Sequence, residues 1–149
     1  MPAVSDPEIA RLCARYSELI DAGDFARAGA LFHQGTLTIA DTPITATGST
    51  AVQQVFERFI RIYSDDGTPH TKHVTTNLVV DADGASAAAG RSYFTVFQRT
   101  DDLPLQAIMV GGYEDRYQIG ESGWGFAHRR IRIDHVGDVS RHLLRSLHG

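Results

Sequence analysis

The sequence has one cysteine, Cys13, among 149 residues. A single cysteine cannot form an intramolecular disulfide and cannot supply a cysteine-rich zinc site. Basic residues are also few, because 14 lysines and arginines stand against 18 aspartates and glutamates and give a formal net charge of −4. No basic block is available to neutralise the phosphates of a nucleic acid. We therefore expect neither a disulfide framework nor a nucleic-acid partner.

Long apolar runs are missing as well. No stretch approaches the roughly 20 apolar residues that span a bilayer, and the first residues lack the basic and apolar segments of a secretory signal. We therefore expect a cytoplasmic protein without a membrane partner. Hydrophobic residues make up 42% of the chain and charged residues 21%, which is typical of a globular protein. The length fits one domain, and we expect residues 1–149 to form it.

Three segments have the periodicity of amphipathic helices. The first begins near Ser5 and ends at Asp21, before Gly23, a residue suited to a helix C-terminus. A shorter helix follows Asp24 and forms a helical corner with the first, since almost no linker separates them. The third covers residues 49–63.

From residue 71 onward the period changes to two, and turn clusters separate four strand candidates. These strands are expected at residues 71–81, 85–99, 105–119 and 124–136, after a shorter strand pair within 36–48. Helices followed by a run of strands indicate an α+β fold, in which the helices cover one face of a curved antiparallel sheet. The tail, residues 138–148, is expected to form one short helix or a docking segment.

His73 is a candidate base in the first long strand. Alternation places it on one side with Thr75, and an apolar row occupies the other side. That row consists of Val74, Thr76, Leu78 and Val80. In a sheet that wraps around a pocket, the side of His73 is the one that can present a base to a ligand. The alternative is a histidine that bonds to a neighbour in the core or at the surface.

Other catalytic or metal-binding patterns receive little support. His70 and His73 have the spacing of some metal ligands, but strand residues three apart point to opposite faces. No matching histidine or carboxylate pair occurs elsewhere, and we expect no metal. The signatures of serine hydrolases and of nucleotide-binding loops are absent from the sequence.

The order of these features resembles the SnoaL-like branch of the nuclear-transport-factor-2-like (NTF2-like) superfamily over nearly the whole chain. The resemblance rests on Tyr-x4-Asp at the end of the first helix, and on KHVTTNLVVD, GGYEDRY and GWGFAHRRI. The superfamily implies a cone-shaped, cystatin-like α+β barrel. In this barrel, a bent antiparallel sheet and the N-terminal helices enclose a mostly apolar pocket.

Within the superfamily, the pattern is similar to scytalone dehydratase, bile-acid 7α-dehydratase and hexachlorocyclohexane dehydrochlorinase, which share a His–Asp pair. The resemblance implies His73 as the base, Asp21 as the carboxylate that orients it and Tyr16 as a hydrogen-bond donor. The implied substrate-binding residues are Arg129, Phe94, Val96, Met109 and Tyr113. The dehydratases carry a further His or Asp on the strand equivalent to residues 85–99, where this sequence has none.

These residues favour a cofactor-independent lyase or isomerase that acts on a hydrophobic small molecule. A carboxylate that accepts from one imidazole nitrogen fixes the tautomer and leaves the other nitrogen free to take a proton. Neither a metal nor an organic cofactor is required. Two alternatives stay open: a non-catalytic ligand-binding or assembly module, and a polyketide cyclase or ketosteroid-isomerase-like enzyme. The resemblance also implies a homo-oligomer, either a dimer or a trimer.

Overall fold

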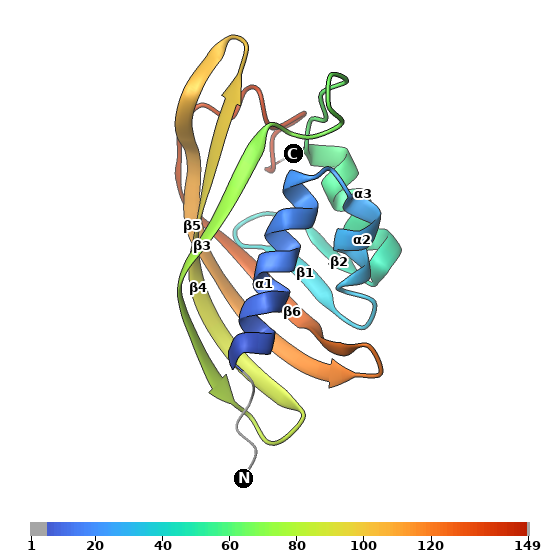
Figure 1. The fold of residues 1–149 in the computed structure, drawn as a ribbon. Helices are drawn as coiled ribbons and strands as arrows, with labels where there is room; N and C mark the ends of the chain where they lie inside the picture. Colours follow the sequence, from blue (N-terminus) through green and yellow to red (C-terminus); the bar gives the residue numbers. More distant parts are fainter. Residues whose placement is uncertain (1–5, 149) are drawn as a thin grey trace.

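The computed structural model describes residues 6–148, in which helices pack against one face of a curved, six-stranded sheet (Figure 1). The helices are α1 (Asp6–Asp21), α2 (Phe25–Ala30) and α3 (Ser49–Phe59). The strands are β1 (Thr36–Ile39), β2 (Thr45–Thr47), β3 (Thr71–Ala82), β4 (Ala87–Thr100), β5 (Leu103–Gly120) and β6 (Gly123–Val136). The predicted α+β fold is confirmed, although the predicted first residue of the first helix, Ser5, lies outside the described residues.

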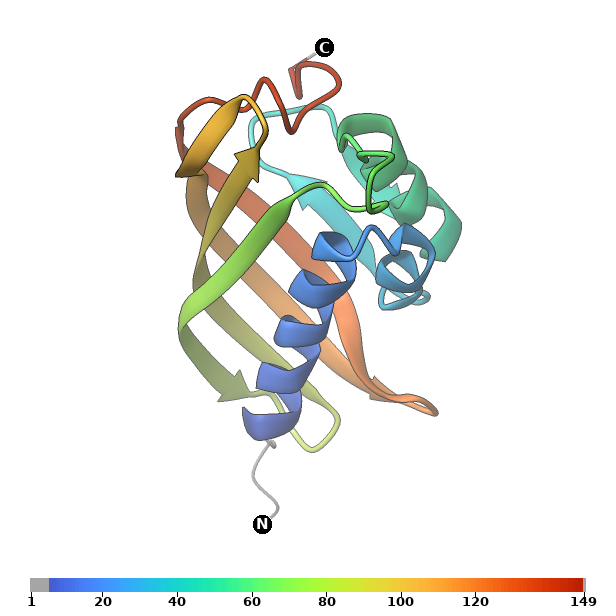
Figure 2. The ribbon, with the colours of Figure 1, turned by 45° about the horizontal axis from the view of Figure 1, so that its top comes forward.

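The sheet has the strand order β2-β1-β6-β5-β4-β3. Strands β3 to β6 form the antiparallel meander that the turn clusters predict. Strand β1 instead pairs with β6 in parallel, with Thr36 opposite His128. The sequence does not predict this pair, because it joins segments that lie far apart in the chain. The sheet bends around α1, which lies along its concave side (Figure 2).

Strand β3 contains a bulge. Thr76 pairs with Tyr93, whereas Val79 pairs with Arg91, so β3 has one more residue than β4 in this interval. Asn77 lies within it and has a positive φ of 57°, a conformation that asparagine tolerates better than most residues. Because one extra residue inverts the alternation of side chains, the two halves of β3 turn opposite sets inward.

The bulge changes which side chains of β3 face the core. Before the bulge, His73 faces the interior and Val74 is 40% exposed. After it, Leu78 and Val80 pack against the core. The continuous apolar row predicted opposite His73 is therefore wrong, because strict alternation does not hold through Asn77. The inward direction of His73 does not depend on that row.

The helix α3 ends at Phe59, before the predicted end at residue 63. Ile60 adopts an extended conformation, with φ −102° and ψ 127°, and forms a β-bridge with Leu143 of the tail. The Leu144 N–H also donates to the Phe59 carbonyl at 2.8 Å. The tail is therefore a docking segment, which is one of its two predicted forms.

Aromatic rings fill the core between the helices and the concave face of the sheet. Tyr16 of α1 makes edge contacts with Phe32, Phe56, Tyr113 and Phe126, at centroid distances of 5.8–6.1 Å. Edge-to-face packing is a favoured geometry for such rings. The rings join the first helix to the helical corner, to α3 and to strands β5 and β6, and they fix the position of Tyr16.

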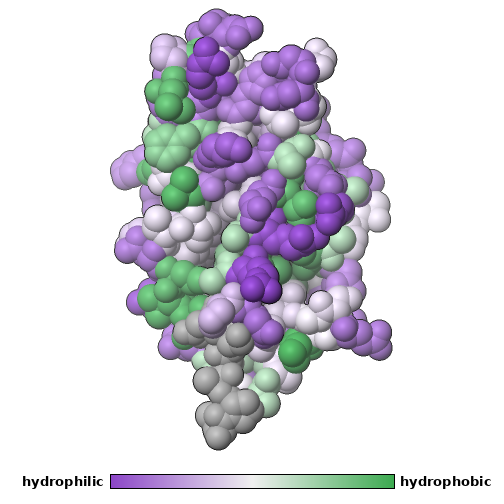
Figure 3. Space-filling model, viewed as in Figure 1, coloured by the Kyte–Doolittle hydropathy of each residue, from purple (hydrophilic) through white to green (hydrophobic). Residues whose placement is uncertain are grey.

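The outer surface carries apolar side chains over the strands. Large hydrophobic residues there that are more than one third exposed are Val74, Val79, Tyr93, Phe97, Leu105, Ile119 and Val136. Figure 3 shows apolar patches over the strands at the left of the view, and hydrophilic side chains over much of the remaining surface. No helix within residues 6–148 has the length and apolarity needed to cross a membrane.

Candidate active site

A cavity of about 90 Å³ lies between the helices and the concave face of the sheet. Its lining includes six of the predicted site residues, namely Tyr16, His73, Phe94, Val96, Met109 and Tyr113. Apart from two tyrosines and two histidines, every side chain of the lining is apolar. The cavity therefore concentrates a few polar groups in a low-dielectric environment, where their interactions are stronger than in water.

His73 and Asp21 meet at the wall of this cavity. The His73 Nδ1 lies 2.6 Å from the Asp21 Oδ1, as in a charge-assisted hydrogen bond. The His73 backbone N–H donates to the Asp21 Oδ2, and the Thr71 hydroxyl donates to the Oδ1, both at 2.8 Å. The two side chains are only 10% and 9% exposed. Three hydrogen bonds thus fix the carboxylate, and the carboxylate fixes the ring.

The end of α1 positions Asp21. Gly23 has a φ of 74° and its N–H donates to the Ile20 carbonyl, while the Asp24 N–H donates to the Leu19 carbonyl, both at 2.9 Å. This is the pattern of a helix that ends at a left-handed glycine. The chain at Gly23 also passes close to the turn before β3. A Cβ on Gly23 would lie only 2.3 Å from the Gly67 carbonyl oxygen.

We expect Gly23→Ala to lower the free energy of unfolding by more than about 1 kcal/mol, because alanine is strained at positive φ and its Cβ would clash. Gly84→Ala is the matched control. Gly84 has a similar φ of 79°, but a Cβ there would meet nothing within 4 Å. Urea denaturation of both variants measures the two losses in the free energy of unfolding and separates the clash from the backbone strain. Equal losses in the two variants would show that the close approach to Gly67 does not matter for stability.

Arg129 lies behind the cavity wall and is absent from the lining. Its Nε and Nη2 donate to the two carboxylate oxygens of Asp115, each at 2.9 Å, and both side chains are fully buried. Its guanidinium carbon lies 3.6 Å from the centroid of the Tyr113 ring and 4.4 Å from that of Tyr16. Because Asp115 holds it in this position, Arg129 supports two tyrosines of the wall and has no direct access to the cavity.

The two tyrosines keep their protons. Burial raises the pKa of Tyr16 to about 12, although the charge of Arg129 acts in the opposite direction. Burial also raises the pKa of Tyr113 well above its usual value. Both hydroxyl groups are therefore hydrogen-bond donors at neutral pH.

Sequence reasoning missed one polar residue of the cavity. His142, from the tail, lines the cavity together with His73, and their ring centroids are 6.5 Å apart. The side chain of His142 is buried, and its Nδ1 has no hydrogen-bond partner. The tail has no strong periodicity, so the only available signal was a histidine beside Leu143 and Leu144 in a segment expected to dock.

The protonation of His142 should make the fold acid-sensitive. Burial, helped by His73 and opposed by Asp21, lowers the pKa of His142 to about 4. In the unfolded chain a histidine titrates near 6.5, so between these pH values the unfolded state binds a proton that the native state does not. Stability therefore rises with pH across this window.

We expect the wild type to lose about 2 kcal/mol of stability through His142 between roughly pH 7 and pH 5. The His142→Leu variant lacks this titration and should lose less over the same interval. Urea midpoints of both proteins at the two pH values give the comparison. An equal loss in both proteins would contradict the neutral, buried state of His142.

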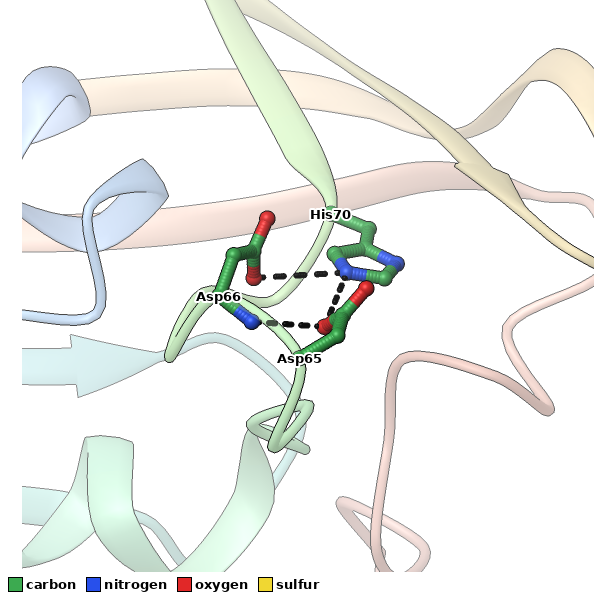
Figure 4. A group of neighbouring side chains, drawn as sticks. All are labelled: Asp65, Asp66 and His70. Atoms are coloured by element: carbon green, nitrogen blue, oxygen red, sulfur yellow. Dashed lines mark hydrogen bonds and ion pairs between the residues drawn. The ribbon is translucent and has the colours of Figure 1, made fainter.

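One group of potential metal ligands occurs within residues 6–148, on the turn before β3. The ligand atoms of Asp65, Asp66 and His70 lie within 4.8 Å of one another, and both carboxylates turn toward the imidazole (Figure 4). The His70 Nε2 is 2.9 Å from the Asp65 Oδ1, and the Asp66 Oδ1 accepts from the N–H and hydroxyl of Thr68. Both aspartates are exposed. These hydrogen bonds account for the turn without an ion.

Comparisons with known proteins agree with this architecture. The family model of the SnoaL-like domain matches residues 5–130. No curated protein matches the chain. A protein with a cystatin-like fold from Nostoc punctiforme is 23% identical, with a TM-score of 0.75, and the match covers 93% of this chain and 98% of that chain.

Two further structures have similar folds. A protein of unknown function from Mycobacterium tuberculosis is 27% identical, with a TM-score of 0.71 and coverage of 87% of this chain and 72% of that chain. A proposed scytalone dehydratase from Novosphingobium aromaticivorans is 25% identical, with a TM-score of 0.70 and coverage of 87% and 84%. The chain belongs to the SnoaL-like domain family and has the NTF2-like, cystatin-like fold that its motifs predict.

Proposed function

We propose that this protein is a cofactor-independent lyase or isomerase that removes a proton from a small hydrophobic molecule. The observation that carries the proposal is the 2.6 Å hydrogen bond between His73 Nδ1 and Asp21 Oδ1 at the wall of an apolar cavity. Asp21 fixes the imidazole tautomer, and the opposite nitrogen, Nε2, acts as the base. Tyr16 donates a hydrogen bond to the oxygen on which negative charge develops.

An elimination by this site conserves the protons of the protein. His73 takes the proton from a carbon next to a carbonyl group, and the released electron pair forms a carbon–carbon double bond. The bond between the next carbon and its hydroxyl oxygen breaks. The proton on His73 passes to the departing hydroxide, which leaves as water. In an isomerisation, the proton returns instead to another carbon of the same molecule.

The lining of the cavity selects the substrate. Phe94, Val96 and Met109 provide an apolar surface, and Tyr113 adds a hydroxyl group. Arg129 packs against the rings of Tyr16 and Tyr113, and Asp115 compensates its charge, so Arg129 supports the two tyrosines without adding a net charge behind the site. A compact cyclic molecule with one or two oxygen functions fits this combination.

The cavity volume sets a limit on substrate size. About 90 Å³ is less than the roughly 300–1,000 Å³ of typical ligand pockets. An outer groove of about 500 Å³ adjoins the cavity, and the two share Met109, Ile133, Leu143 and Leu147. A larger substrate therefore enters from this groove only if side chains of the tail, Leu143 among them, move aside.

The proposal is tested by hydrogen–deuterium exchange. The protein is incubated in D₂O with cyclic ketones and cyclic β-hydroxyketones, and NMR follows the loss of the protons next to the carbonyl group. We expect at least one compound to exchange or to lose water faster than in protein-free buffer. The products of elimination, conjugated enones, are also detected by their ultraviolet absorbance.

A ligand-binding module is the second candidate, and the small volume of the cavity favours it. Such a module binds a ketone of the panel without exchanging its protons. Ligand-induced shifts in the NMR spectrum, together with exchange rates equal to those in buffer for the whole panel, would favour binding over catalysis.

We also propose that the protein forms a dimer or trimer through the outer face of its sheet, where Val74, Tyr93 and Phe97 are exposed. Burial of such side chains stabilises association. Light scattering should give two or three times the mass of one chain, and Tyr93→Glu should shift the protein toward the monomer. Ile62→Glu, at an exposed apolar residue after α3, is the control. A wild-type monomer at high concentration would contradict the oligomer.

A further inference from the structure

Hydrogen bonds from other segments of the chain hold the tail backbone around His142 in place. The Arg61 N–H donates to the His142 carbonyl at 2.9 Å. The Arg141 carbonyl accepts from the Tyr63 hydroxyl at 2.5 Å and from the Gln98 Nε2 at 3.0 Å. Gln98 is itself 1% exposed. The segment after α3 therefore forms hydrogen bonds to the carbonyls of both residues 141 and 142, and strand β4 forms one to residue 141. These bonds give the imidazole of His142 a defined position at the cavity.

The imidazole of His142 lacks the partners that a structural histidine normally has. The residue is 4% exposed, and its buried Nδ1 forms no hydrogen bond. Buried polar groups in native proteins are nearly always paired. The rings of His142 and His73 line one cavity with their centroids 6.5 Å apart, and no hydrogen bond within residues 6–148 joins them. A polar atom of a ligand placed between the two rings can contact both.

The protonation state of His142 suits a hydrogen-bond donor. Burial lowers its pKa to about 4, so that the ring is neutral at pH 7 and carries one N–H. The other charged or titratable groups that act on it are His73, which also lowers the pKa, and Asp21, which raises it. A neutral imidazole can polarise a carbonyl oxygen without placing a second positive charge beside His73.

We propose that His142 is a second catalytic imidazole of this cavity, which donates a hydrogen bond to the substrate oxygen while His73 removes the proton. The inference rests on the proposed function. The ligand class is a small, mainly apolar ketone or β-hydroxyketone, because the polar side chains of the described lining are two histidines and two tyrosines. His142 lies beyond residues 5–130, which the family model matches, so this role is inferred from the present structure.

Two variants test the role of the donor. His142→Leu removes it, and His142→Gln keeps a side-chain N–H. For the most reactive ketone of the panel, we expect His142→Leu to lower kcat by about 10²-fold, as is typical for the loss of one oxyanion donor. His142→Gln should restore at least a tenth of the lost rate, whereas a purely structural histidine gives no such rescue. His33→Leu, at an exposed histidine, is the control. A His142→Leu variant within about twofold of wild-type kcat would overturn the proposal.

A binding measurement separates failure of this inference from failure of the proposed function. Cyclohexanone is added to the full-length protein, and NMR of the ¹⁵N-labelled histidine rings is recorded. We expect the ring nitrogens of His142 to shift in the wild type and also in His73→Ala, which lacks the base. If the ketone protons do not exchange but the His142 signals shift, the proposed role of His73 as a base is wrong, whereas the contact between His142 and the ketone is supported. If cyclohexanone shifts other signals but not His142, or shifts none at its highest soluble concentration, the contact is overturned. This readout also decides the matter if His142→Leu does not fold.

Discussion

Replacement of His73 by alanine is expected to slow proton removal by about 10²–10⁴-fold, the usual loss when a general base is removed. The fold should survive, because the residue 73 backbone N–H and the Thr71 hydroxyl still bind Asp21. The measurement is the rate of deuterium exchange or enone formation for a ketone that the wild type turns over. Thermal unfolding of the same samples checks that the variant is folded.

Two comparisons make the result specific to the base. Asp21→Asn preserves the shape of the orienting side chain but removes its charge, so the rate should fall while His73 remains present. His128→Ala is the matched control, because His128 bonds to Thr38 at 3.0 Å and does not line the cavity. A His73→Ala variant that retains wild-type turnover, or a His128→Ala variant that loses as much, would refute the assignment of His73.

The parts of the site that the sequence predicts are those set by local pattern. The helical period and a following glycine place Asp21 at the end of a helix, and the period of two places His73 on the side of its strand opposite Val74 and Thr76. Their contact could not follow from periodicity, because the two residues are far apart in the chain. The resemblance supplied that pairing, and the 2.6 Å distance agrees with it.

The features that were missed depend on long-range contacts. The bulge at Asn77 follows from the fit between β3 and β4, and the sequence of β3 alone reads as regular alternation. His142 reaches the cavity because the tail pairs with Ile60, a contact made possible by the early end of α3. Arg129 is absent from the cavity lining, and Asp115 on the neighbouring strand binds it behind the wall. Each outcome was decided by a partner that local reasoning could not identify.

The buried pair of Arg129 and Asp115 should dominate the response of stability to mutation. Both side chains are fully buried, and Asp115 accepts a further hydrogen bond from the Tyr117 hydroxyl at 2.8 Å. Arg129→Met leaves the carboxylate without its positive partner. We expect a loss of roughly 3–5 kcal/mol in the free energy of unfolding, because an uncompensated buried charge is strongly destabilising. Urea denaturation at pH 7 measures it.

The exposed pair of Arg116 and Asp83 provides the matched control, since its atoms approach to 2.8 Å but its side chains are 56% and 65% exposed. Arg116→Met should cost less than about 1 kcal/mol, because solvent screens exposed pairs. The double variant Arg129→Met, Asp115→Leu should recover part of the loss by removing the orphaned charge. Equal losses for Arg129→Met and Arg116→Met would contradict this explanation. If the predicted difference is found, the packing of Tyr16 and Tyr113 at the cavity wall depends on a buried charge pair that lies outside the cavity lining.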